Sequence, residues 1–202
     1  MKAAAEHAKL SELIIWIDQN TSNVELPADE RSLMAIGCFD IALEHQASIA
    51  MLYSYKHYGS ALALLRPLAE SLVRGLWLLQ CATEKDLKVF KKDNDDRAFG
   101  FSKLIRDIET NTGTPSGVLS AFRAASWSTL CSFTHTGFHQ VSRRHSPGKV
   151  EENYSEAELA KTLGVAAALG LMAGGLIIHM SGKHELLQSF FERMSAYAST
   201  TP

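Results

Sequence analysis

The chain has 202 residues, of which 46% are hydrophobic and 21% are charged, and its formal net charge is -2. This length fits one domain with a continuous core, and the composition is ordinary for a folded soluble protein. The small net charge excludes a general attraction to nucleic acid or to anionic membranes. An anion would therefore have to bind to a local patch.

The first half of the chain is predicted to be helical. Apolar residues at helical spacing predict a helix over residues 3–19. Pro27, followed by acids, indicates the first turn of a second helix that ends before Gly59. Ser60 then starts a third helix, and Thr83 is suited to cap a short charged fourth helix.

Helical patterns continue toward the middle of the chain. Asp95 or Asp96 can cap a fifth helix, and the sequence NTGTPSG at 111–117 is predicted to be a loop. A sixth helix spans about residues 118–136 and ends at Gly137.

The last third is predicted to contain an irregular stretch and two more helices. Residues 138–153 are expected to be irregular, with a turn at 146–148. Ser155 and Glu158 form a capping box for a glycine-rich helix, and a last amphipathic helix covers about 183–197.

No run alternates as a half-buried strand would. The sequence therefore predicts one all-α domain over residues 1–202, a bundle of seven or eight helices. Its core is expected over about 27–198, with residues 1–26 forming an N-terminal helix and linker.

Residues 163–180 raise the question of a membrane, because this stretch carries no formal charge and is at the lower limit of a spanning length. It is rich in alanine and glycine, acids precede it, and no aromatic belt flanks it. We expect a central helix of a bundle and no membrane association. Its glycines would let neighbouring helices approach closely (Gly164, Gly170, Gly174 and Gly175).

The N-terminus and the cysteines point to the cytoplasm. Charged residues interrupt the first residues before the apolar run begins, unlike a signal peptide. The three cysteines lie within apolar helical patterns and form no CxxC pair, which is typical of free thiols in a reducing compartment.

A charged stripe crosses the otherwise apolar third helix. Arg66, Glu70 and Arg74 are spaced four residues apart and share one helical face. Charges in such a helix must be paired or must face a cleft. Two interpretations stay open: an ion-pair stripe that fixes helix register, or a cleft wall where an arginine binds an anion. Pro67 predicts a bend or a helix start at Arg66.

The segment SFTHTGFHQVSRRH at 132–145 contains three histidines and two arginines but no acid. His135 would lie in the last turn of the sixth helix, where the negative helix end favours an imidazolium and general acid–base chemistry. His139, Arg143 and Arg144 follow it and could fold over the same region. Histidine with arginine and no carboxylate suits metal-independent RNA cleavage.

Other interpretations of this segment stay open. His135 could cap its own helix, and the arginine pair could be solvated. His135 and His139 could bind a metal if the helix continued through Gly137 and a third ligand came from elsewhere, such as Glu44, His45 or Glu70.

The sequences SALALLRPLAESLVRGLWLL at 60–79 and SWSTLCSFTHTGFHQVSRR at 126–144 resemble an uncharacterised bacterial family of about this length. That family has an Arg–Pro–Leu–x–Glu helix and a Thr–His–Thr–Gly segment, and the likeness covers about residues 32–187. It implies a fold class and no function.

More loosely, the chain looks like the HEPN superfamily of α-helical bundles, often dimeric, which includes RNA-cleaving toxins and phage-defence nucleases. Those enzymes carry an arginine four to six residues before a catalytic histidine. Here the nearest arrangement is reversed, with His139 before Arg143 and Arg144. The resemblance implies a homodimer, and Arg66 and His135 would supply the two roles from different helices.

The leading hypothesis is thus a HEPN-like ribonuclease in stress or defence that needs no metal or cofactor and binds RNA through a local basic patch. His135 would be the acid–base group, Arg66 would hold the phosphate and Glu70 would orient Arg66. Arg74, His139, Arg143 and Arg144 would contact substrate. One alternative is a non-catalytic dimeric module for a partner protein or a small anion. Another is a metal-dependent helical hydrolase.

Overall fold

The computed structural model describes residues 2–92, 99–111 and 117–200, and it confirms an all-α fold. The helices in these ranges are α1 (Lys2–Thr21), α2 (Glu30–Ser54), α3 (Tyr58–Gln80), α4 (Glu84–Phe90), α5 (Phe101–Asn111), α6 (Val118–Thr134), α7 (Phe138–Val141), α8 (Glu156–Met180) and α9 (His184–Thr200). Two short strands, β1 (His145–Ser146) and β2 (Lys149–Val150), precede α8. This is one or two helices more than expected, and the short α7 is the helix that the sequence did not predict.

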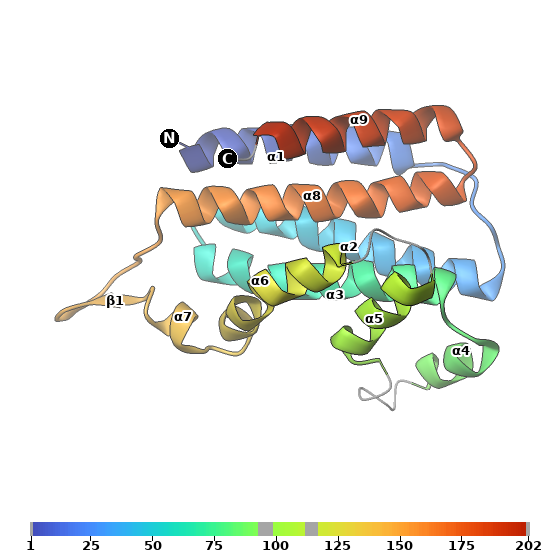
Figure 1. Cartoon of the computed structure of the whole chain (residues 1–202). Coiled ribbons are helices and arrows are strands. Elements are labelled where there is room, and N and C mark those ends of the chain that lie inside the picture. Colours follow the sequence, from blue (N-terminus) through green and yellow to red (C-terminus); the bar gives the residue numbers. More distant parts are fainter. Residues whose placement is uncertain (1, 93–98, 112–116, 201–202) are drawn as a thin grey trace.

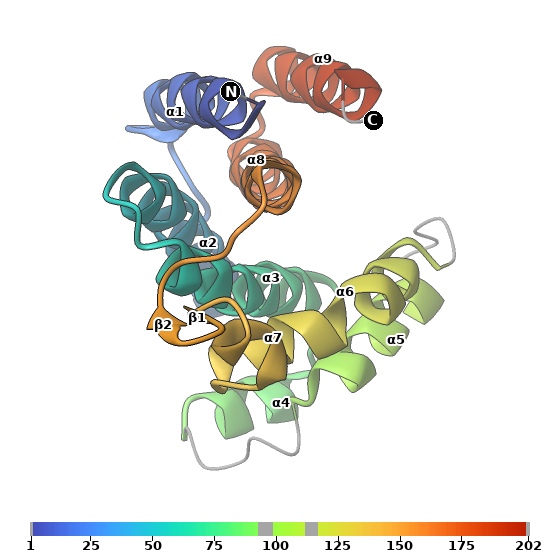
Figure 2. The same ribbon diagram turned by 90° about the vertical axis from the view of Figure 1, so that its left-hand side faces the viewer.

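The helices form layers around α8 (Figures 1 and 2). On one side of α8 lie α1 and α9, and on the other lie α2 and α3. Beyond α3 lie the shorter helices α4 to α7 (Figure 2). Of the described helices, α8 alone is long and apolar enough to cross a membrane, and 56% of its apolar window is buried against its neighbours. It is packed as a core helix, as its composition predicts.

The first helix belongs to the same core as the rest of the bundle. Leu10, Leu13 and Ile17 of α1 are buried together with residues of α2, α3 and α8. The hydrophobic core therefore begins earlier along the chain than the expected residue 27.

A close contact between α2 and α8 depends on Gly170. The amide of Gln46 is buried against this glycine and donates to the carbonyl oxygen of Ala166 at 3.2 Å. A Cβ atom at Gly170 would lie 2.1 Å from the Gln46 amide, and one at Gly174 would lie 2.7 Å from Phe190. At Gly164 and Gly175 the nearest neighbours are at ordinary contact distance. Two of the four predicted glycines thus allow close helix packing.

Two predicted N-terminal caps are confirmed. Thr83 caps α4 and Ser155 caps α8, because each side chain accepts a hydrogen bond from the third backbone N–H of its helix.

Two helices begin at other residues than expected. The second helix begins at Glu30 rather than at Pro27, because the Asp29 side chain accepts from Ser32 N and serves as the cap. The third helix begins at Tyr58, two residues before the expected start. The predicted caps at residues 95 and 96 and the middle of the predicted loop at 111–117 lie outside the described residues.

The stretch at 138–153 is more ordered than predicted. It contains α7 and the hairpin of β1 and β2, in which His145 pairs with Val150 and Ser146 pairs with Lys149. Gly148 has a positive φ of 77° within the predicted turn, which is a conformation that glycine adopts freely. The hairpin brings the chain from α7 back to the start of α8.

Candidate functional site

Arg66, Glu70 and His135 form one hydrogen-bonded cluster at the seam between α3 and α6. Both Nε and Nη2 of Arg66 lie 3.0 Å from Oε1 of Glu70. The third guanidinium nitrogen, Nη1, is hydrogen-bonded to Nε2 of His135. Because a guanidinium has only donors, the imidazole accepts at Nε2, and its proton is then on Nδ1. His135 thus presents a basic nitrogen to a cation.

Two stacked aromatic rings pack against the guanidinium group of Arg66. The guanidinium carbon lies 4.9 Å from the ring centroid of Trp127, and Trp127 stacks on Phe101 with centroids 3.9 Å apart. A cation over an indole face is attracted to the ring and loses rotational freedom. Arg66 is therefore held by a carboxylate, an imidazole and an aromatic face at once.

Glu70 is partly open to solvent and is not sealed between two arginines. The exposed fractions of the Arg66 and Glu70 side chains are 20% and 32%. Among the described residues, Glu70 pairs with Arg66 alone. A fully buried Arg–Glu–Arg stripe, one of the two interpretations of the sequence, is therefore wrong.

The end of α6 sets the position of His135. The helix ends at Thr134, so His135 is its C-cap, and Thr136 takes a left-handed conformation with φ 54°. Gly137 N then donates to the Ser132 carbonyl at 2.7 Å, which is the long hydrogen bond of a Schellman motif. The helix stops earlier than predicted, and the left-handed residue is a threonine rather than the glycine.

Pro67 contributes to the seam although it lies inside α3. The helix runs unbroken through Pro67, so the predicted helix start at Arg66 is wrong. Proline has no N–H, which leaves the carbonyl oxygen of Ala63 without its intrahelical donor. The hydroxyl of Thr134 lies 3.2 Å from that oxygen and 2.9 Å from the Leu130 carbonyl. The residue before His135 is thereby tied to α3.

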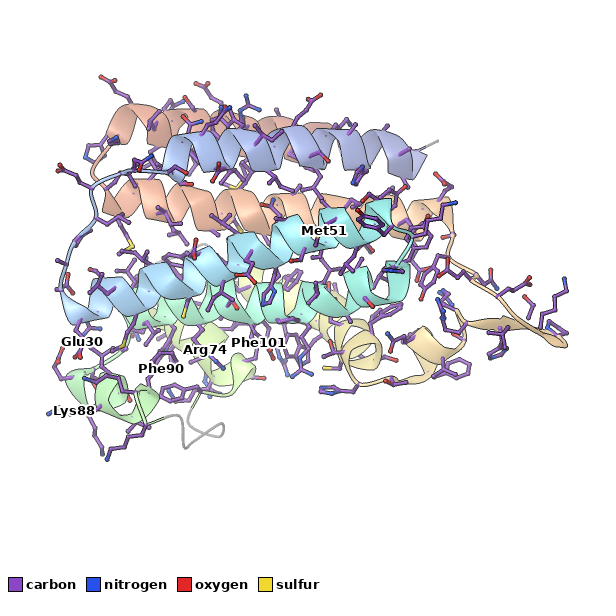
Figure 3. The ribbon with its side chains drawn as sticks, turned by 180° about the vertical axis from the view of Figure 1, so that it is seen from behind. Glu30, Met51, Arg74, Lys88, Phe90 and Phe101 are labelled. Carbon is purple, nitrogen blue, oxygen red and sulfur yellow. The ribbon has the colours of Figure 1, made fainter. Side chains whose placement is uncertain are left out.

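Arg74 does not join the cluster. In Figure 3, Arg74 lies below α3, toward Phe101 of α5. Its Nε is buried and has no hydrogen-bond partner among the described residues, and the same holds for Nε of Arg123 on α6. A buried donor without a partner costs folding free energy.

The two arginines after α7 are neutralised by acids that follow them in the chain. Arg143 binds both carboxylate oxygens of Glu158 at 2.9 and 3.2 Å, and Arg144 binds Glu152 at 2.8 Å. These hydrogen bonds raise the pKa of both guanidinium groups above their usual value. Glu158 was expected to complete the capping box of α8, and its carboxylate binds Arg143 instead.

His139 and His135 do not share a helix. His139 lies on α7, and its backbone N–H donates to Ser132 Oγ at 3.0 Å. The pair therefore lacks the continuous helix that the metal-site interpretation required. In the described ranges, no three His, Cys, Asp or Glu side chains converge as metal ligands would.

Comparison with known families places the chain in one group. The family model DUF6988, described as a family of unknown function, matches residues 39–202. The chain belongs to the DUF6988 family. The match includes every residue of the cluster, and it agrees with the expected uncharacterised family. No curated protein and no solved structure matches the chain.

Positive charge in this DUF6988 protein gathers on the helices that carry the cluster. Among the described helices, α3, α5 and α6 together contain five Lys or Arg residues and three Asp or Glu residues. In each of α1, α2, α8 and α9 the acids outnumber the bases. The sequence did not predict this asymmetry, because the five bases are spread along the chain from Arg66 to Arg123 and their helices meet only in the fold.

Two cysteines of the DUF6988 protein, Cys38 and Cys81, are poor nucleophiles. All three cysteines are free, and burial raises the pKa of the Cys38 and Cys81 thiols. A thiol with a raised pKa is protonated near neutral pH and does not attack as a thiolate.

Proposed function

We propose that this DUF6988 protein is a HEPN-like, metal-independent ribonuclease with a stress or defence role in the cytoplasm. The observation that carries the proposal is the hydrogen bond between Arg66 and Nε2 of His135, made across two helices in a partly open position. It joins a proton acceptor to a permanent cation, the two groups that RNA cleavage needs. The HEPN resemblance also implies a homodimer.

In the proposed reaction, the 2′-hydroxyl of RNA is the nucleophile. His135 Nε2 takes its proton while the 2′-oxygen forms a bond to phosphorus, and Arg66 turns from the imidazole to the phosphate oxygens. The 5′-oxygen leaves and takes the proton back from His135. The products are a 2′,3′-cyclic phosphate and a 5′-hydroxyl, and the balance requires neither water nor a metal.

Arg66 would stabilise the charged phosphorane, and Glu70 would keep the arginine in place. Glu70 binds Nε and Nη2 through a single oxygen. Nη1, which is bonded to His135 in the free protein, would bind the phosphate when substrate displaces the imidazole. Stabilisation of developing charge by a fixed donor is commonly the largest catalytic contribution.

The charge asymmetry supports a polyanionic substrate. The helices around the cluster carry a surplus of two positive charges, whereas the whole chain carries -2. The positive helices would attract a phosphate backbone, and the acidic helices elsewhere would repel it. RNA binding should therefore weaken as the salt concentration rises. Arg74 and Arg123 would contact neighbouring phosphates. The paired Arg143 and Arg144, with the exposed His139, would lie at the edge of this RNA path.

The test is cleavage of end-labelled single-stranded RNA by purified protein in EDTA. We expect His135→Ala and Arg66→Ala to lower the cleavage rate by at least about 100-fold. The matched controls are His184→Ala and Arg193→Ala on α9, a helix on the other side of the bundle (Figure 2). An intact RNA substrate after incubation with the parent protein, or full activity of His135→Ala, would refute the proposed ribonuclease activity.

A second candidate is a non-catalytic module that binds a small anion. It is favoured by one observation: every described hydrogen bond of Arg66 is made to a side chain of the same cluster, as in a static recognition site. Under this function, RNA or inorganic phosphate would bind to the parent protein and lose affinity in Arg66→Ala, while RNA would stay uncut.

A further inference from the structure

We propose that a cavity between α3, α6 and the start of α8 is a binding site for a small amphipathic anion, specifically an aliphatic monocarboxylate of medium chain length. The cavity has a volume of about 400 Å³ and is lined by residues of all three helices. This volume lies at the lower end of the range for small-molecule sites. It suits one small ligand rather than a helix of a partner protein.

The inner wall of the cavity is apolar. Leu62 and Leu65 of α3, and Leu130 and Phe133 of α6, are each buried and face this space. Val165 of α8 continues the same wall. An alkyl chain that fills it would remove its own apolar surface from water, at about 25 cal/mol for each Å².

The mouth of the cavity carries one surplus positive charge. Arg143 and Glu158 line it as a bidentate ion pair, with side chains 32% and 22% exposed. Lys161 also lines it, and in the part of the chain that the structure describes no carboxylate pairs with this lysine. An anionic head group would complete the charge balance at the mouth, whereas a cationic one would meet an unpaired ammonium.

Two hydroxyl groups among the lining residues add further donors. Ser126 and Thr129 of α6 line the cavity, and neither side chain has a hydrogen bond within the described residues. Together with Lys161 they offer donors that a carboxylate can accept. A few convergent polar groups on an apolar cavity are typical of sites that fix the orientation of a ligand.

This site is separate from the Arg66–His135 cluster. Leu65 and Arg66 are adjacent on α3, so their side chains point about 100° apart around the helix. Neither Arg66 nor His135 is among the residues described as lining the cavity. Ligand binding in this cavity does not depend on ribonuclease activity, and it can be measured without RNA.

The test is isothermal titration of the full chain with sodium decanoate, at concentrations below micelle formation. We expect saturable binding of one decanoate per chain. Decanol should bind about tenfold more weakly because it lacks the charge, and decyltrimethylammonium should not bind. Equal affinity for the cationic and anionic probes, or no saturable binding of decanoate, would overturn the proposal.

Two variants locate the site. Lys161→Gln should weaken decanoate binding about tenfold. Lys183→Gln is the control, because Lys183 is exposed and lies outside the cavity, and it should leave decanoate binding unchanged.

Ala125→Trp should block the cavity, and Ala124→Trp is its matched control, because both alanines are exposed on α6 but only Ala125 lines the cavity. Since both alanines are exposed, both variants should fold. Binding that survives Ala125→Trp would place decanoate elsewhere and refute the site.

Discussion

The hydroxyl of Thr134 lies 3.2 Å from the carbonyl oxygen of Ala63, the acceptor that Pro67 leaves without its helical donor. This contact ties the end of α6 to α3 directly before His135. A proline that looked like an interruption of its helix thus creates an acceptor for a neighbouring helix. The next residue along the chain, His135, makes the hydrogen bond with Arg66.

Replacement of Thr134 by valine should disturb the position of His135 without changing any residue of the cluster. Thr134→Val keeps the shape but removes the donor, so we expect a loss of about 1 kcal/mol in the free energy of unfolding. RNA cleavage should fall about tenfold, because a small displacement of a catalytic group is costly. Thr134→Ser keeps the hydroxyl and should retain the activity of the parent. Loss of activity in the serine variant would contradict this role.

The partial exposure of Glu70 predicts a small effect on stability and a larger one on activity. Its side chain is 32% exposed, and its carboxylate has one described partner. We therefore expect Glu70→Ala to change the free energy of unfolding by less than about 1 kcal/mol, as for other solvent-accessible pairs. Cleavage should still fall, because Arg66 loses its anchor. A loss of several kcal/mol in urea unfolding would show instead that the pair acts as a buried structural bridge.

Glycine positions on α8 should differ sharply in their tolerance of alanine. A Cβ atom at Gly170 would overlap the buried Gln46 amide at 2.1 Å, whereas at Gly175 the nearest atom is 3.8 Å away. Gly170→Ala should destabilise by about 1–3 kcal/mol through overpacking. Gly175→Ala should be neutral or stabilise by up to about 1 kcal/mol, since alanine favours helix. Chemical denaturation of both variants measures the difference, and equal stabilities would contradict the close packing of α2 on α8.

Asp107 should contribute to the acid sensitivity of the fold. Burial acts to raise its pKa, but hydrogen bonds from Lys103 at 2.7 Å and from the buried Trp77 indole at 2.9 Å outweigh burial and hold the pKa below its ordinary value. A lowered pKa gives stability that is fully present above the unfolded value of about 4 and is lost as the pH falls through the folded pKa.

The matching variant is Asp107→Asn. It should be less stable than the parent at pH values above about 5, and the difference should shrink as the pH falls through the folded pKa of Asp107 and its carboxyl group becomes uncharged. Urea unfolding across this range measures the effect. A constant difference at every pH would show that the aspartate charge contributes nothing.

Local patterns were sufficient for the fold class and for several caps. Thr83 and Ser155 cap their helices as predicted, because a cap is decided by residues within one turn. The spacing of Arg66 and Glu70 likewise predicted that they share a face, and they pair within α3.

Contacts between distant segments could not be predicted in the same way. Arg66 and His135 are 69 residues apart, and their hydrogen bond depends on how α6 docks on α3. Arg143 looked unpaired because the stretch around it has no acid, yet Glu158 reaches it from α8. The end of α6 was misplaced because glycine is the usual left-handed residue, and here Thr136 adopts that conformation.

A double-mutant cycle tests whether Arg66 and His135 act as one catalytic unit, as we propose. The rate of 2′,3′-cyclic phosphate formation on single-stranded RNA in EDTA would be measured for the parent, Arg66→Ala, His135→Ala and the double variant. We predict that each single variant loses at least about 100-fold and that the double variant loses no more than the worse single one, because groups that act together are not additive. Losses that multiply in the double variant, or a folded His135→Ala protein with the parent's rate, would show that the two residues do not form a catalytic unit.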